Sequence, residues 1–172
     1  QYYFVESSEL FDREGFYGSK TGGDYADNAE RFGLFCRAVL EACKLIGVPD
    51  LFHVHDWHAA LLSILLRTVY YFDPQLGKVG VVLSIHNAGY QGSFLPQTIP
   101  LLLLPWDVYT PDKVEQNGMF NSLKGGIGYS EYLTAVSPTY AKEIQTEEFG
   151  SSLDGMLRRR QADLRGILNG VD

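Results

Sequence analysis

The sequence predicts an α/β fold, a Rossmann-like parallel sheet with flanking helices. Short apolar runs alternate along the chain with segments in which apolar residues recur every three or four positions, as strands and amphipathic helices do. The run over residues 79–85 is continuously apolar, which is typical of a parallel strand covered on both faces. Strand–helix–strand order implies right-handed crossovers. We therefore expect ligands to bind at the carboxyl ends of the strands.

The first half of the chain contains the clearest helix signal. From Asn28 onward, Phe32, Cys36 and Val39 recur at helical steps, and Gly47 ends the pattern. The segment Glu6–Ala26 before it is polar, contains glycine and shows no apolar periodicity. The other elements expected here are a strand over Tyr2–Val5, a buried-type strand over Leu51–His55 and a second helix over Leu61–Tyr71.

The second half continues the alternation after the strand at 79–85. Ser137 and Pro138 are typical of the N-cap and first position of a helix. The remaining elements expected are a long irregular segment over Asn87–Gln116, a weak helix over Gly118–Tyr129, a short strand over Tyr132–Val136, a helix near Gly150–Gln161 and a strand over Arg165–Leu168.

Composition bounds the class of protein. The chain has 172 residues, 45% of them hydrophobic, enough for one domain with a full core. A formal net charge of -7 argues against nucleic acid or an anionic membrane as partner, because both would be repelled. The longest apolar run, Ile99–Trp106, is too short to span a bilayer.

The two ends of the sequence suggest a piece of a longer chain. The first residues, Gln1–Val5, already resemble a strand and include no methionine, and the last, Ile167–Asp172, run from a strand into a turn. Natural domains seldom begin and end so abruptly.

The two cysteines are expected to be reduced. Cys36 and Cys43 fall on the same predicted helix, where seven residues rise about 10.5 Å. That separation exceeds the Cα distance that a disulfide allows. Packed thiols are compatible with a cytosol-like compartment.

The segment HVHDWH, residues 53–58, is the sharpest candidate site. Three histidines and an aspartate could bind a metal, although the aspartate stands one position earlier than in the H-x-H-x-D-H pattern of binuclear metallohydrolases. The second interpretation is sugar recognition: Asp56 accepts hydrogen bonds, Trp57 offers an apolar surface and His58 donates or accepts. The structural alternative is that the histidines are core residues and Asp56 caps a helix.

Two further polar clusters follow predicted strands. SIHNAGYQG, residues 84–92, places His86 and Asn87 after the buried strand, followed by glycines that permit close backbone approach. LNGVD, residues 168–172, places Asn169 after the last strand. Either cluster could also be a simple turn. The convergence of three polar clusters on one edge of the sheet favours a site there.

Glycine-rich spellings elsewhere are weaker signals of a phosphate loop. Lys20-Thr21-Gly22-Gly23 follows no strand, and we expect loop flexibility there rather than phosphate binding. Lys124-Gly125-Gly126 lies within or beside a helix and also follows no strand.

The ordered set of motifs HVHDWHAALL, SIHNAGYQG, LTAVSPTYAKEI and ILNGVD resembles the N-terminal catalytic domain of bacterial glycogen synthases and plant or algal starch synthases. The resemblance covers nearly the whole chain and takes in DREGFY, DNAERF and LPW. It implies a GT-B fold, in which two Rossmann-like domains face each other across a cleft. It also implies a retaining glucosyltransferase that uses ADP-glucose to extend the non-reducing end of an α-1,4-glucan, with no cofactor and no metal.

The resemblance also implies roles for individual residues. His86 matches a histidine that contacts the transferred glucose, and Asp56 an aspartate near the reacting sugar; these are the catalytic candidates. The substrate-binding candidates are Tyr17, Trp57, His58, Asn87 and Asn169, the last near the donor at the exit toward the second domain.

The chain departs from the family pattern at both ends. The first strand with its lysine–glycine nucleotide loop, and the whole C-terminal domain, are expected in the family but absent from residues 1–172. We therefore expect a partial domain that is inactive alone and whose partners are ADP-glucose, an α-1,4-glucan and the missing domain. The compartment implied is the cytoplasm for a bacterial protein and the plastid for a plant or algal one. A catalytically inactive glucan-binding module of the same descent is the alternative.

Overall fold

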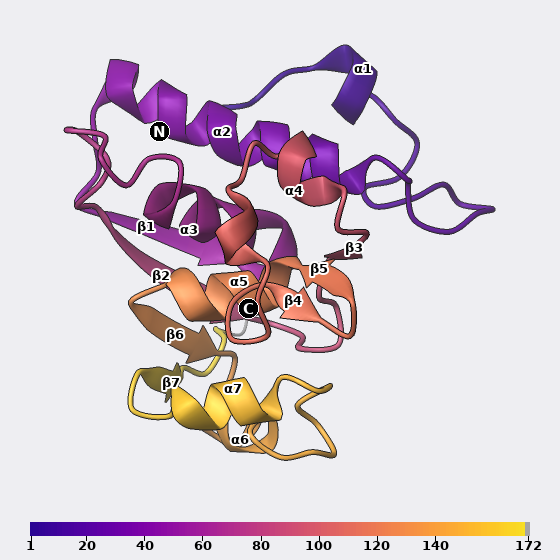
Figure 1. The fold of residues 1–172 in the computed structure, drawn as a ribbon, viewed down its shortest axis with the longest axis vertical. Coiled ribbons are helices and arrows are strands. Elements are labelled where there is room, and N and C mark those ends of the chain that lie inside the picture. Colours follow the sequence, from indigo (N-terminus) through magenta and orange to yellow (C-terminus); the bar gives the residue numbers. More distant parts are fainter. Residues whose placement is uncertain (171–172) are drawn as a thin grey trace.

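The computed structural model describes residues 1–170 and contains two sheets with helices packed around them (Figure 1). In chain order the helices are α1 (Ser8–Phe11), α2 (Asn28–Ile46), α3 (Asp56–Arg67), α4 (Thr98–Leu101), the 3₁₀ turn η1 (Trp106–Val108), α5 (Ser122–Tyr129), α6 (Pro138–Glu143) and α7 (Asp154–Arg159). The strands are β1 (Leu51–His55), β2 (Gly80–Ile85), β3 (Ser93–Phe94), β4 (Glu115–Gln116), β5 (Met119–Asn121), β6 (Tyr132–Ala135) and β7 (Leu164–Gly166).

The main sheet is parallel throughout, with strand order β1-β2-β6-β7. Its register places His55 beside Ser84 and Ala135 beside Gly166, so the carboxyl ends of the four strands form one edge. A small antiparallel sheet, ordered β3-β5-β4, forms within the segment between β2 and α5. The predicted α/β class with a parallel sheet and flanking helices is confirmed.

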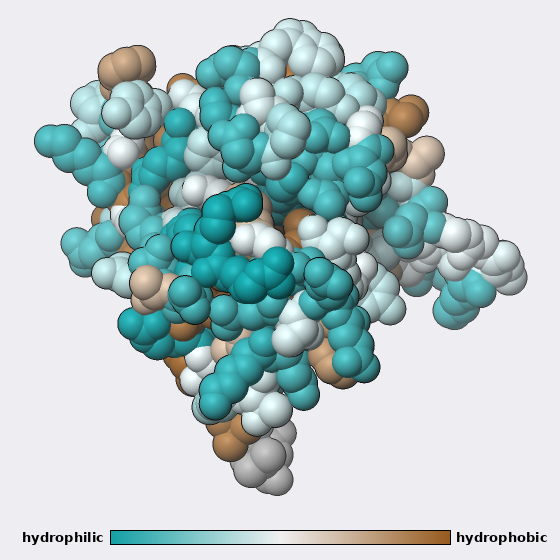
Figure 2. Space-filling model, turned by 60° about the horizontal axis from the view of Figure 1, so that its bottom comes forward, coloured by the Kyte–Doolittle hydropathy of each residue, from teal (hydrophilic) through white to brown (hydrophobic). Residues whose placement is uncertain are grey.

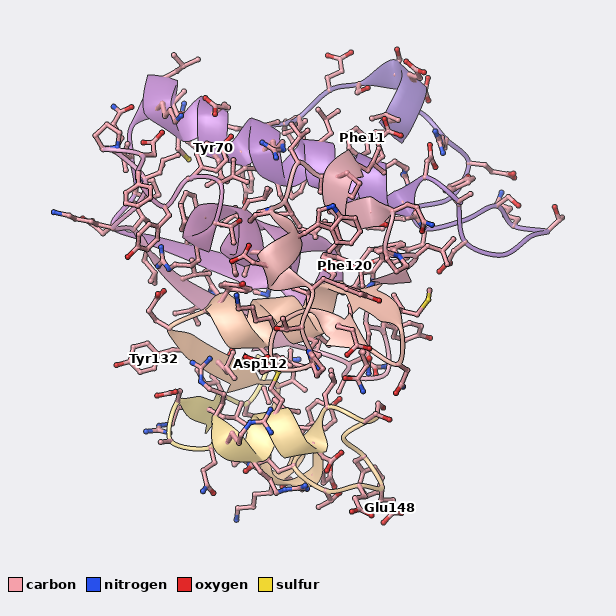
Figure 3. The ribbon with its side chains drawn as sticks, in the orientation of Figure 1. Phe11, Tyr70, Asp112, Phe120, Tyr132 and Glu148 are labelled. Atoms are coloured by element: carbon pink, nitrogen blue, oxygen red, sulfur yellow. The ribbon has the colours of Figure 1, made fainter. Side chains whose placement is uncertain are left out.

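The core lies on one face of the main sheet. Val54, Leu83 and Leu133 alternate with outward-facing neighbours and are buried against α3 and α5. Figure 3 shows Phe120 of β5 pointing into the interior, whereas Tyr132 of β6 points outward; Phe120 is fully buried and Tyr132 is 58% exposed.

The other face of the sheet is open along β1. Leu51, His53 and His55 are exposed there, and among the described residues β1 pairs only with β2. Val82 of β2, on the same face, is only half-buried. The expected strand at 79–85 is present as β2, but its coverage on both faces is only partial: Ser84 on this face is buried and Val82 is half-buried, because α3 and α5 both pack on the other side. An apolar hollow of about 560 Å³ lies between this edge and α2.

Glycines allow α3 and α5 to pack closely. A Cβ on Gly126 would lie 2.5 Å from the Ala60 Cβ and 3.1 Å from Leu83 Cδ2. On Gly125 it would collide with the Ile64 side chain. Gly125 and Gly126 of the Lys124-Gly125-Gly126 segment thus lie in a helix–helix contact that is too close for any side chain at these two positions.

Elements with strong local signals are confirmed. The α2 helix spans the predicted range, buries the stripe that includes Phe32, Cys36 and Leu40, and ends at Gly47. In α6, the Ser137 hydroxyl accepts a hydrogen bond from the Tyr140 N–H at 2.9 Å, as an N-cap does, with Pro138 in the first turn.

Other boundaries were predicted incorrectly. The strand over Tyr2–Val5 is wrong: the segment forms no ladder, and Tyr2 and Phe4 are about nine-tenths exposed. The polar loop after it contains the short helix α1. The second helix begins five residues earlier than predicted and ends four earlier, at Asp56 and Arg67. The segment expected to be irregular contains β3, α4, η1 and β4, and Met119–Asn121 forms a strand before α5. The helix α7 is shorter than predicted, and the strand β7 begins one residue earlier and ends two residues earlier than predicted.

Both cysteines are free, as predicted. Cys36 is fully buried under α3, where its Sγ donates to the backbone oxygen of His58. Burial raises the pKa of this thiol to about 12, so it stays protonated and unreactive at neutral pH.

The surface is mixed and mostly hydrophilic on the face drawn in Figure 2, where brown, apolar residues occur only as scattered spots. Within residues 1–170, every helix is too short or too polar to cross a bilayer.

We expect Gly126→Ala to destabilise the protein, although alanine is the better helix former by about 1 kcal/mol. The added methyl group would overlap the Ala60 Cβ and force α3 and α5 apart. The expected loss in the free energy of unfolding is about 1–3 kcal/mol, measured by urea denaturation.

Gly128→Ala is the matched control on the same helix. A Cβ there would meet only the flexible end of Met156, at 3.0 Å. This variant should be as stable as the wild type or slightly more so. Equal stability of the two variants would contradict the close-packing explanation.

Candidate functional site

The site begins at a junction without a loop. β1 ends at His55 and α3 begins at Asp56, which adopts a left-handed backbone conformation with φ of 55°. Aspartate is one of the few residues other than glycine that visit this region. The abrupt turn places Asp56 directly over the carboxyl edge of the sheet.

The Asp56 carboxylate links the ends of two neighbouring strands. Its Oδ1 accepts hydrogen bonds from the backbone N–H of His86 at 2.8 Å and of Asn87 at 3.4 Å. It makes no cap bond to its own helix, so the helix-cap alternative is not what the structure contains. For Oδ2 there is no hydrogen-bond partner among the described residues.

A cavity of about 1000 Å³ opens beside this junction. Four of the predicted site residues line it: Tyr17, Asp56, Trp57 and Asn87. Its wall also includes residues that the sequence did not single out, among them Asp24, Tyr90, Gln91, Ser151 and Ser152.

An aromatic cluster forms one side of this cavity. The Trp57 ring packs edge-on against Phe32 with centroids 4.9 Å apart and lies 5.6 Å from the Tyr17 ring. A Cβ on Gly92, which has a φ of 60°, would collide with the indole, so only glycine allows the loop to cover it. Trp57 is 6% exposed and presents only a small part of its ring.

Tyr17 and His58 form a hydrogen-bonded pair next to the cavity, with the phenol oxygen 3.2 Å from Nδ1. Burial raises the pKa of Tyr17, and the carboxylates of Asp56 and Asp24 raise it further. Burial also lowers the pKa of His58, although Asp56 opposes the shift. Both groups are therefore neutral at pH 7, and one hydrogen bond joins them.

His86 touches the site through its backbone, while its ring pairs elsewhere. Its Nε2 lies 2.9 Å from Nδ1 of His55. His53, further along β1, bonds the hydroxyl of Ser84 through Nε2 at 2.7 Å. Burial, with His53 and His86 nearby, lowers the pKa of His55.

Asn169 lies apart from the cavity. It is exposed beyond β7, and its backbone N–H donates to the Val136 oxygen at 3.3 Å. Val171 and Asp172, the rest of that predicted cluster, lie outside the described residues.

The glycine-rich loop near the N-terminus does not line the cavity with its lysine. Lys20 is exposed and pairs with Glu14 at 3.3 Å. Within residues 1–170, no group of three or more histidine, cysteine, aspartate or glutamate side chains is arranged to hold a metal ion.

The cavity carries acidic and neutral groups but no basic side chain. Asp24 and Asp56 are its two carboxylates, and its lining, drawn from the part of the chain that is described, includes neither lysine nor arginine. Such a wall suits a ligand rich in hydroxyl groups better than a phosphate.

Comparison with known proteins agrees with this architecture. The profile of the starch synthase catalytic domain family matches residues 1–159. The chain belongs to this family. The predicted resemblance to glycogen and starch synthases is thereby confirmed.

The relatives are longer than the chain. The glycogen synthase of Koribacter versatilis is 53% identical over 172 residues, which are 100% of this chain and 35% of that protein. The glycogen synthase of Thermotoga maritima is 47% identical over 171 residues, 99% of this chain and 34% of that protein. A solved catalytic domain of starch synthase IV from Arabidopsis thaliana, bound to ADP and acarbose, matches with a TM-score of 0.84 and 33% identity, covering 96% of this chain and 33% of that one. The chain spans about a third of the length of these relatives.

We expect Asp56→Ala to lower the free energy of unfolding by about 1–2 kcal/mol, because the N–H groups of His86 and Asn87 lose their acceptor and alanine is strained at positive φ. Asp56→Asn keeps an acceptor oxygen and tolerates this backbone, so it should cost less than about 1 kcal/mol. Urea denaturation of both variants tests this. Equal losses would show that the charge, rather than the acceptor geometry, holds the junction.

The lowered pKa of His58 predicts acid sensitivity. As the pH falls through the ordinary histidine pKa of about 6.5, the unfolded chain binds a proton that folded His58 resists. The free energy of unfolding should therefore decrease from pH 7.5 to pH 5.5. In His58→Asn, which keeps an acceptor for Tyr17, the decrease should be smaller; an unchanged decrease would assign the effect to other groups.

Proposed function

We propose that this chain forms the acceptor side of the active-site cleft of a retaining glucosyltransferase that moves glucose from ADP-glucose to the non-reducing end of an α-1,4-glucan. Relatives named glycogen synthase, and the similarity to a starch synthase domain bound to ADP and acarbose, support the reaction class. The assignment to the acceptor side rests on the lining of the cavity, which has two carboxylates and neutral polar groups but, among the described residues, neither lysine nor arginine.

The cavity matches an oligosaccharide in three respects. Asp56 and Asp24 are acceptors for sugar hydroxyls, the Asn87 amide can donate and accept, and aromatic edges from Tyr17 and Trp57 suit the apolar faces of pyranose rings. Its volume of about 1000 Å³ is at the upper end of ligand sites and holds more than one sugar ring.

The reaction demands positioning more than a nucleophile. Charge develops at the anomeric carbon in an oxocarbenium-like transition state, and a nearby carboxylate stabilises it. Asp56 fits this role through Oδ2, since Oδ1 is bonded to the backbone of His86. It either stabilises that charge or orients the acceptor.

The other candidates take supporting roles in this proposal. His86 contacts a hydroxyl of the transferred glucose, which requires its ring to exchange His55 for the sugar. Asn87 lines the same pocket, while Trp57 and the Tyr17–His58 pair form its wall. Asn169 lies at the exit toward the donor side.

The departing diphosphate needs cations that this cavity does not contain. In the proposal, the phosphate-binding groups come from parts of the full-length protein outside this chain. A glucan-binding module without catalysis is the second candidate, and the same feature favours it: the groups for hydroxyl recognition are present without those for the phosphates.

The decisive assay compares the 172-residue chain with the full-length protein that contains it, using radiolabelled ADP-glucose and glycogen. We expect transfer by the full-length protein and none by the chain alone. Asp56→Asn in the full-length protein should lower kcat about 100-fold or more, equivalent to about 2.7 kcal/mol of transition-state stabilisation.

Titration with maltoheptaose separates the two candidates. Binding of maltoheptaose by a full-length protein that never transfers glucose would identify a binding module. Transfer by the isolated chain would contradict the division of the cleft.

A further inference from the structure

Gln91 joins two loops of the cavity wall. Its Nε2 donates to the backbone oxygen of Ala88 at 2.9 Å and to that of Ser151 at 2.8 Å. The first bond lies within the loop that carries Asn87, and the second crosses to a turn 60 residues further along the chain. The amide thus bridges two segments of the cavity wall that lie far apart in sequence.

Gln91 is itself held by a buried group. Its Oε1 accepts from Nδ2 of Asn121 at 2.6 Å, and Asn121 is fully buried. The Oδ1 of Asn121 caps α5 by accepting from the Lys124 N–H at 2.8 Å. The Gln91 amide therefore has one fixed orientation, because exchanging its oxygen and nitrogen would lose all three bonds.

A second amide holds the same turn. Gln116 Nε2 donates to the backbone oxygen of Ser152 at 3.2 Å. Its Oε1 accepts from Nζ of Lys124 at 2.8 Å, and that lysine, 6% exposed, also donates to the Glu115 backbone oxygen. The turn is tied by consecutive carbonyls to two separate amides.

The turn is conformationally unusual. Ser151 and Ser152 both have positive φ, 49° and 67°, a region that residues other than glycine rarely occupy in succession. Both side chains are exposed and both residues line the cavity, and a Cβ on Gly89 would lie 3.9 Å from the Ser151 Oγ. With the carbonyls used by Gln91 and Gln116, the hydroxyls remain for a ligand.

We propose that Gln91 is a positioning residue that fixes the distance between the Asn87 loop and the Ser151–Ser152 turn, and that the two serines contact hydroxyls of the glucan acceptor. The inference rests on the proposed function and assigns acceptor contacts to Ser151 and Ser152, on a part of the cavity wall that the catalytic candidates do not form. It assigns acceptor affinity, rather than donor binding, to this wall.

The test uses Gln91→Leu in the full-length protein. Leucine keeps the volume of the side chain and removes all three hydrogen bonds, so the turn keeps its bond to Gln116 but can shift relative to the Asn87 loop. We expect the KM for maltoheptaose to rise about tenfold or more, while the KM for ADP-glucose changes less than twofold.

Gln145→Leu is the matched control. Gln145 also donates from Nε2 to a backbone oxygen, that of Ala141 at 2.7 Å, but it does not line the cavity. It should lose a similar or smaller amount of stability in a thermal melt and keep both KM values. Equal effects of the two variants on the acceptor KM would reduce Gln91 to a general structural residue and overturn the proposal.

The double variant Ser151→Gly/Ser152→Gly answers the objection that Gln91→Leu merely unfolds the turn. Glycine favours positive φ, so the melting temperature should be unchanged or higher, while both hydroxyls are lost. The acceptor KM should still rise about fivefold or more. An unchanged acceptor KM in this variant would also overturn the proposal.

Calorimetric titration with maltoheptaose separates this inference from the proposed function. A wild-type protein that binds maltoheptaose without transferring glucose contradicts the transferase, yet the Kd values of the variants still decide the role of the turn. A wild type that neither binds maltoheptaose nor transfers glucose overturns both.

Discussion

The direct passage from β1 into α3 is the constraint on which the site depends. With no loop between them, the chain turns at a single left-handed residue, Asp56, whose carboxylate then holds the backbone of His86 and Asn87 at the end of β2. The side chain of Asp56 thereby fixes the end of β1 relative to the end of β2. The first turn of α3 consequently starts at the sheet edge, which delivers Trp57 and His58 to the aromatic cluster around Tyr17.

The cavity is assembled from segments that are distant in sequence, and close packing keeps them together. Gly92 covers the Trp57 ring where any side chain would collide, while Gly125 and Gly126 let α5 approach α3. Asn121, the residue before α5, connects this helix contact to the cavity wall. Its Oδ1 caps α5, and its Nδ2 donates to Gln91 and so orients that side chain. On the proposed positioning role of Gln91, the width of the cavity is linked to the helix contact beneath it through the hydrogen bonds of Asn121 and Gln91.

The sequence predicts the scaffold well and the contacts of the site poorly, for physical reasons. Periodicity marks α2 because its buried stripe repeats every turn, and Ser137-Pro138 marks α6 because capping is local. Tyr2–Val5 has the composition of a strand, but a strand also needs a partner, which no local pattern supplies. The cluster HVHDWH identifies Asp56, whereas its bond to the backbone of His86, the pairing of His86 with His55, and the place of Ser151 in the wall arise from contacts between residues far apart in sequence.

The negative charge of the cavity limits which part of the proposed substrate this chain can bind. On the proposed function, Asp24 and Asp56 stabilise a developing positive charge on the sugar, but the same two carboxylates would repel the diphosphate of a nucleotide sugar. The proposed function therefore requires that cations face this cavity from elsewhere. Because Oδ1 of Asp56 is hydrogen-bonded at the strand junction, the direction of Oδ2, which has no partner among residues 1–170, is fixed as well. On the proposed function, the carboxylate that builds the fold is preorganised for the transition state by the same hydrogen bonds.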